Sequence, residues 1–168
     1  PDPEGRLFNP KHGGGALLDV GVYTVSLASM VFGAPSRIAS LANLGETGVD
    51  EEAGIVLGHD GGEMAVLYTA IRATTPQDAV LMGTRGSIRI HSPWWVPTGL
   101  TVKAGGSEET VAAPFDGNGY NYEAAEVMAC LRAGKTESDV MPLSETRSVM
   151  QTLCDLREQW GLRYPSDG

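Results

Sequence analysis

The feature that most constrains the fold is a change in hydrophobic pattern along the chain. A glycine triplet at residues 13–15 precedes an apolar stretch at 16–32, and Gly33 and Pro35 follow it, which is the usual stop signal of a helix. Glycine turns then separate short β-rich runs, which lie at 37–44, 53–59, 63–72, 79–83, 87–91, 100–104 and 110–113. Turns this short join antiparallel neighbours. The pattern therefore predicts a mainly antiparallel meander after one apolar helix.

Two further helices are expected after the strands. They are predicted at 122–133 and 145–160, with Asn121 and Ser144 as N-cap residues, because both side chains can accept from a backbone N–H. Helix, then strands, then helices is an α+β order. We expect a large, open, mainly antiparallel sheet with helices covering one face. No internal repeat, low-complexity tract or linker interrupts the chain, so the prediction is a single domain over residues 1–168.

Charge and composition exclude several kinds of partner. The formal net charge is −9 and no basic stripe is present, so neither nucleic acid nor an anionic membrane surface is expected as a partner. The apolar stretch at 16–32 contains Asp19 and Gly21 and is shorter than the ~20 residues that a bilayer span needs. It is predicted to be a buried helix, with no membrane association. The chain opens at Pro1 without an initiator methionine or a signal sequence, which predicts a start at a domain boundary.

The two cysteines, Cys130 and Cys154, have neither metal-ligand nor disulfide-framework spacing. We expect two buried free thiols, no metal site and a cytoplasmic location. Nucleotide motifs are also incomplete. No G-x-G-x-x-G occurs, and the Gly-Lys-Thr at 134–136 ends a predicted helix instead of opening one. No nicotinamide or nucleotide site is therefore complete in this chain.

The segment GGGALLDVGVY at 13–23 carries the clearest chemical signal. Asp19 and Tyr23 are four residues apart and so share one helical face. Gly21 lies between them, where a helix-interior glycine costs ~1 kcal/mol relative to alanine, so it is expected to allow close approach of another backbone or of a flat ligand. One interpretation is structural: Asp19 binds a neighbour's backbone donor and Tyr23 packs with its hydroxyl bonded. In the other, the Tyr23 phenol exchanges a proton with a substrate oxygen, which requires a nearby cation because a free tyrosine has a pKa of about 10.

The sequence resembles the Gfo/Idh/MocA oxidoreductases, and among them the dihydrodiol dehydrogenase-like branch. The resemblance is carried by GGGALLDVGVY at 13–23, and it extends through DPEGRLFNP at 2–10, GTRGSIRIHSPWW at 83–95, YNYEAAEVMACLRAGKTES at 120–138 and MPLSETRSVMQTLCDLREQWGLRYP at 141–165. Members have an N-terminal Rossmann domain that binds NAD(P) and a C-terminal α+β domain with an open sheet. This chain resembles only the second domain.

The resemblance implies roles for individual residues. Tyr23 would be the catalytic acid/base and Asp19 would help to orient the substrate or its partner group, together with a lysine from a Glu-Lys-Pro motif that lies in the N-terminal domain and is not in this chain. NAD or NADP would be bound mainly by that missing domain, and none by this chain alone. The parent protein would be a dehydrogenase of CH–OH groups in a sugar, polyol or dihydrodiol, and the isolated chain is expected to be inactive.

Three other residues are candidates for the substrate pocket. Trp95 and Tyr120 fall in a loop and just before a helix, where aromatic side chains can wall an apolar pocket. His12 lies beside the glycine triplet and could contact substrate or phosphate. Each has an alternative: the aromatic residues as core or interface anchors, and the histidine as a solvated loop residue.

The sheet makes a separate prediction about partners. The run at 64–71 is apolar at nearly every position, whereas a strand with one solvated face alternates. A covered outer face predicts a homodimer through the open sheet. The alternative to an enzyme is a stand-alone, non-catalytic dimeric module for binding or scaffolding. Such a module would not need Asp19 and Tyr23 together beside Gly21.

Overall fold

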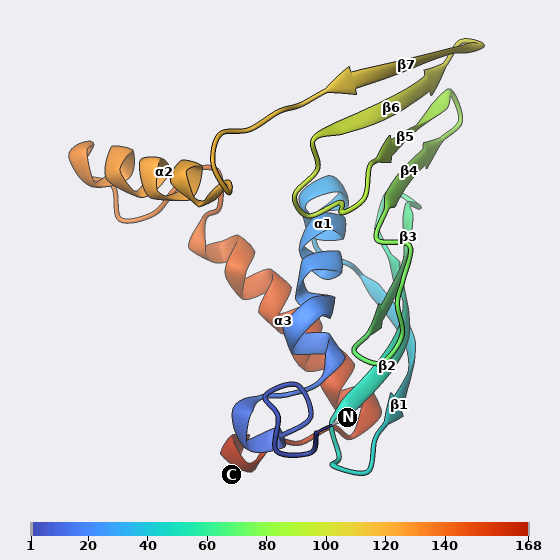
Figure 1. The fold of residues 1–168 in the computed structure, drawn as a ribbon, viewed down its shortest axis with the longest axis vertical. Helices are drawn as coiled ribbons and strands as arrows, with labels where there is room; N and C mark the ends of the chain where they lie inside the picture. Colours follow the sequence, from blue (N-terminus) through green and yellow to red (C-terminus); the bar gives the residue numbers. More distant parts are fainter. Residues whose placement is uncertain (1, 168) are drawn as a thin grey trace. The chain divides into compact units, whose positions relative to one another are not determined.

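The computed structural model describes residues 2–167 (Figure 1). The chain divides into two compact units, one formed by Pro1–Thr74 with Met141–Gly168 and the other by Thr75–Val140. Each unit has its own antiparallel sheet. The α+β class and the antiparallel strands are confirmed. The expectation of one domain over residues 1–168 stays a prediction.

The first unit is a three-stranded sheet with two helices packed on one face. Strands β1 (Arg37–Leu44), β2 (Asp50–Gly58) and β3 (Met64–Ala70) are adjacent in chain order. Helices α1 (Val22–Phe32) and α3 (Leu143–Trp160) lie side by side and contact the sheet (Figure 1). Strand alternation turns every second side chain of β2 inward. The buried core consists of Leu17, Val25, Ala28, Ala53, Ile55, Leu57, Val149, Leu153 and Leu156.

The helix expected at 16–32 begins with a π-helical turn. Residues Leu17–Gly21 form this turn, and the Val22 N–H bonds to the Leu17 carbonyl five residues earlier. The α-helical part then runs from Val22 to Phe32, where Gly33 ends it with a positive φ of 78°. Turns of this kind are rare and frequently occur at functional sites. The helix is also less covered than its composition predicts, since Met30 is 75% and Phe32 39% exposed.

By length and apolar composition, residues Pro10–Phe32 qualify as a segment that could cross a membrane. The core helix of a soluble protein passes the same test, and so does a signal sequence. In this structure Leu17, Val25 and Ala28 belong to the buried core of the first unit. Those contacts are the ones expected of a core helix.

The second unit contains a four-stranded meander and one helix. The strands are β4 (Ala79–Gly83), β5 (Gly86–Ile90), β6 (Gly99–Ala104) and β7 (Ser107–Ala112), in that order. Helix α2 (Tyr120–Arg132) has no buried residue. The expected single sheet is therefore present as two. In the connection between β3 and β4, Pro76 has no N–H to donate and Gln77 has a φ of +57°, so this segment does not extend either sheet.

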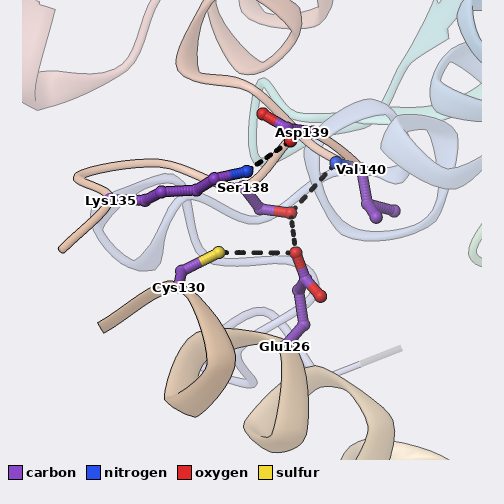
Figure 2. Close-up of polar contacts among 6 residues, drawn as sticks. All are labelled: Glu126, Cys130, Lys135, Ser138, Asp139 and Val140. Atoms are coloured by element: carbon purple, nitrogen blue, oxygen red, sulfur yellow. Dashed lines mark hydrogen bonds and ion pairs between the residues drawn. The ribbon is translucent and has the colours of Figure 1, made fainter. Parts of the chain in front are cut away.

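Polar contacts join α2 to the loop that follows it (Figure 2). The Glu126 carboxylate accepts from the Ser138 hydroxyl at 2.5 Å and from the Cys130 thiol at 3.4 Å, and Lys135 forms an ion pair with Asp139. The Ser138 contact, with a smaller contribution from Cys130, lowers the pKa of Glu126. Burial and the Glu126 carboxylate raise the pKa of the Cys130 thiol, which makes it a poor nucleophile at neutral pH. The hydrogen bond between Glu126 and Ser138 holds the loop that follows α2 against the helix.

Several details differ from the sequence expectations. Helices α2 and α3 begin at Tyr120 and Leu143, two residues early, with Gly119 and Pro142 at the N-cap positions. Neither of these residues has a side chain that caps the helix, and Asn121 and Ser144 lie inside the helices. The predicted burial of both thiols is wrong for Cys154, which is exposed.

Candidate functional site

Segments of the first unit approach one another closely at the glycine triplet, which precedes the π turn. At Gly14, a Cβ would lie 2.7 Å from the Leu7 carbonyl oxygen and 2.9 Å from that of Arg6. At Gly15, which has a φ of 116°, a Cβ would lie 2.2 Å from Oδ1 of Asp50. Side chains at these two positions would displace the N-terminal segment and the aspartate. The glycines are therefore required by close contacts within the protein.

Asp50 fills the N-terminal end of the helix that follows the triplet. Its Oδ2 accepts from the Leu17 backbone N–H at 2.6 Å, and the residue is fully buried. Burial raises the pKa of Asp50 to about 6, although the backbone N–H bond from Leu17 opposes that shift. Within the described residues, Oδ1 has no hydrogen-bond partner. The N–H groups at this end of the helix attract negative charge and so oppose the effect of burial.

Tyr164 anchors the C-terminal segment to the glycine triplet. Its hydroxyl donates to the Gly14 carbonyl at 2.7 Å, and the Arg157 guanidinium lies 4.6 Å from the centre of its ring. Burial, and then the nearby Asp50 carboxylate, raise the pKa of Tyr164 to about 12. Sequence reasoning did not find Asp50 or Tyr164. For Asp50, the available signal was an acid shortly before the apolar residues that alternate along β2.

Asp19 lies within the π turn and forms an ion pair with Arg6 from the N-terminal segment. The Asp19 side chain is 22% exposed and that of Arg6 is 68% exposed. The hydrogen bond and the charge of Asp19 raise the pKa of Arg6. The structural interpretation of Asp19 gave it a backbone donor as partner, whereas the partner is a side chain. Arg6 was not among the predicted site residues.

Tyr23 lies in the first turn of α1 and is 53% exposed. Its side chain is thus not packed in the core. Gly21 does allow a close approach, but of the protein's own groups: a Cβ there would lie 3.3 Å from Leu17 Cδ1 and 3.5 Å from Thr69 Cγ2. The Thr69 hydroxyl also donates to the Ala16 carbonyl at 3.2 Å. Strand β3 therefore supports the π turn that carries Asp19 ahead of Tyr23.

The three candidate pocket residues, His12, Trp95 and Tyr120, lie outside the helix that carries Asp19 and Tyr23. His12 ends a short 3-10 helix, Pro10–His12, and is exposed. Trp95 and Tyr120 belong to the second unit, and they are 44% and 72% exposed. The Trp95 ring meets Trp94 edge-on, with 6.0 Å between ring centres. Exposure excludes a core role for both aromatic residues in this chain, and their place in a substrate pocket stays a prediction.

The start of the π turn does not fit a phosphate group. Helix N-termini after glycine-rich loops commonly bind phosphate through free backbone N–H groups. Here the Leu17 N–H is bound to the Asp50 carboxylate, which would also repel an anion. A dinucleotide's pyrophosphate is therefore not held at this place. Among residues 2–167, no group of three or more His, Cys, Asp or Glu side chains is placed to hold a metal ion.

Comparison with known proteins identifies the family. A sequence profile of the GFO/IDH/MocA C-terminal domain matches residues 1–89. The trans-1,2-dihydrobenzene-1,2-diol dehydrogenase of Xenopus tropicalis is 38% identical over 170 residues, which cover 95% of this chain and 51% of that protein. The Homo sapiens enzyme of the same name is 37% identical over 171 residues, covering 96% and 51%. This chain thus spans about half the length of these relatives.

Solved structures share the fold at lower sequence identity. The aldose-aldose oxidoreductase of Caulobacter crescentus, complexed with glycerol, has a TM-score of 0.81 at 17% identity, covering 94% of this chain and 49% of that one. A mutant 3-ketoreductase of Actinomadura kijaniata, in complex with TDP-benzene and NADP, has a TM-score of 0.77 at 17% identity, covering 94% and 50%. The fold and the profile match agree, and this chain belongs to the GFO/IDH/MocA family, matching its C-terminal domain.

Proposed function

We propose that this chain is the substrate-binding part of an NAD(P)-dependent oxidoreductase that acts on a CH–OH or carbonyl group of a sugar, polyol or dihydrodiol. The observation that carries the proposal is the half-exposed phenol of Tyr23, which follows the ion-paired Asp19 on one continuous helix. The names of the relatives support the substrate classes, since they are dihydrodiol dehydrogenases and sugar-related oxidoreductases.

Tyr23 exchanges a proton with the substrate oxygen in this proposal. When a carbinol is oxidised, the deprotonated Tyr23 oxygen takes the hydroxyl proton while the carbon loses a hydride; in the reverse direction the Tyr23 phenol donates its proton to the carbonyl oxygen. The nicotinamide cofactor supplies or receives the hydride. Asp19 accepts from a substrate hydroxyl and so orients the reacting carbon. Cofactor binding falls to a part of the protein outside this chain, which agrees with a helix N-terminus already filled by Asp50.

The test is Tyr23→Phe in the full-length protein. Loss of an acid/base group typically costs 100-fold or more, so turnover should fall by about that factor with little change in cofactor affinity. Tyr122→Phe is the matched control, since Tyr122 is 51% exposed and lies in α2. Unchanged turnover in Tyr23→Phe would overturn the assignment of Tyr23.

The outer face of the three-stranded sheet supports a homodimer in this proposal. Its exposed side chains include Leu41 at 83%, Val66 at 76%, Met64 at 64% and Tyr68 at 47%. Contiguous exposed apolar side chains are characteristic of interaction surfaces. A twofold pair of identical sheets is the simplest closed arrangement that covers them. We thus propose two partners: a small-molecule substrate and a second copy of the protein.

A further inference from the structure

We infer that Arg6 is a positioning residue of this site, which holds the Asp19 carboxylate in the orientation that meets the substrate. The inference rests on the proposed function and adds to it a residue that lies outside the GGGALLDVGVY segment. The guanidinium Nη1 of Arg6 donates to Oδ1 of Asp19. This contact engages one carboxylate oxygen, which leaves Oδ2 to accept from a substrate hydroxyl.

The backbone around Arg6 is fixed to the glycine triplet. The Gly15 N–H donates to the Leu7 carbonyl at 2.8 Å, and the Gly14 N–H donates to the Asn9 carbonyl at 3.1 Å. The missing side chain of Gly14 admits the Arg6 and Leu7 carbonyls to that position. The N-terminal segment therefore presents Arg6 from a rigid base beside the π turn.

The burial of the two partners indicates which group is being positioned. Asp19 is mostly covered, at 22% exposure, whereas Arg6 is 68% exposed. A partly buried carboxylate needs a partner, because burying an unpaired charge is unfavourable. Arg6 is the one ion-pair partner of Asp19 within residues 2–167. The pair therefore fixes a partly buried carboxylate four residues before Tyr23 in the chain.

Kinetics of the full-length protein separate this role from a structural one. Arg6→Ala should raise the substrate KM by about 10-fold or more with a smaller fall in kcat, because a misplaced orienting group costs up to ~100-fold. Arg6→Lys should recover most of the loss, since a lysine can reach one carboxylate oxygen with its charge. The control is Lys11→Ala, which removes an exposed positive charge five residues away. The control should change neither constant, and all three variants should remain folded at the assay temperature.

A double-mutant cycle tests whether Arg6 acts through Asp19. If it does, Arg6→Ala should add no further loss to an Asp19→Asn protein, because the two changes remove the same interaction. Independent, multiplying losses would overturn the inference. So would kinetic constants for Arg6→Ala that match those of Lys11→Ala.

A nitrogen-15 NMR measurement of the arginine side chains gives a readout without turnover. The Arg6 guanidinium signals should be split and slow to exchange in the wild-type protein and should collapse in Asp19→Asn. Collapsed signals in the wild type would overturn the inference even if the enzyme is active. An intact pair in a protein that oxidises and reduces none of the proposed substrates would instead overturn the proposed function, and with it any part for Arg6 in turnover.

Discussion

At the scale of single residues, each of the three glycines at residues 13–15 is required for a different reason. Gly13 has a φ of 67° and open space around it, Gly14 admits the Arg6 and Leu7 carbonyls, and Gly15 admits the Asp50 carboxylate. The triplet thus joins the N-terminal segment, the start of β2 and the π turn. Its part in the site is to fix where Asp19 and Tyr23 are held.

Alanine substitutions should distinguish these positions. Gly13→Ala should cost about 1–2 kcal/mol, the usual penalty of a left-handed residue with a side chain. Gly15→Ala should cost more, about 3 kcal/mol or above, because it adds a contact at 2.2 Å with Asp50 Oδ1 to an unfavourable φ of 116°. Chemical denaturation measures both values. Equal losses at the two positions would contradict the close contact with Asp50.

Asp50 should also give the fold a measurable pH dependence. Its pKa is raised from 3.8 to about 6 in the folded state, so the protonated form is favoured there. Stability from this group is therefore fully present below pH 4 and is lost as the pH rises through 6, by up to about 3 kcal/mol. Asp50→Asn keeps an oxygen for the Leu17 N–H and should remove this decline. Denaturation curves at pH 4, 5, 6 and 7 measure it, and an equal decline in the variant would exclude Asp50 as the cause.

At the scale of elements, α3 stabilises the first unit through one buried stripe. Leu156 is fully buried, whereas Met150 on the same helix is 46% exposed. Leu156→Ala should cost about 2–5 kcal/mol of unfolding free energy, as expected for a cavity in a core. Met150→Ala should change it by about 0.5 kcal/mol or less. A similar loss from both substitutions, measured by urea unfolding, would contradict the packing of α3 described above.

Elements whose pattern is local were predictable from the sequence. The bounds of β1 and β4 agree with the structure, since glycine turns and apolar runs mark them directly. The π turn was not predictable, because it depends on Asp50 and Thr69, which contact it from 33 and 53 residues away. The ion pair of Arg6 with Asp19 was missed for a similar reason. It requires the Gly14 contact that brings the N-terminal segment to the π turn.

At the scale of the whole molecule, the outer face of the three-stranded sheet predicts the oligomeric state. Val66→Lys places a charge on the proposed interface and should convert a dimer to a monomer in light scattering without unfolding the protein. Ser107→Lys adds the same charge at the exposed first residue of β7 and should leave the dimer intact. A wild-type protein that is monomeric at micromolar concentration would contradict the proposed dimer.

The central claim is that this chain contributes the proton-transfer group of a nicotinamide-dependent oxidoreductase. Isotope transfer tests it most directly: full-length protein is mixed with oxidised cofactor and with sugars, polyols or dihydrodiols that carry deuterium on the reacting carbon. The account predicts that deuterium appears on the nicotinamide ring for at least one of these classes, and that Tyr23→Phe slows its appearance by about 100-fold. No transfer from any class, or transfer at an unchanged rate in Tyr23→Phe, would contradict it.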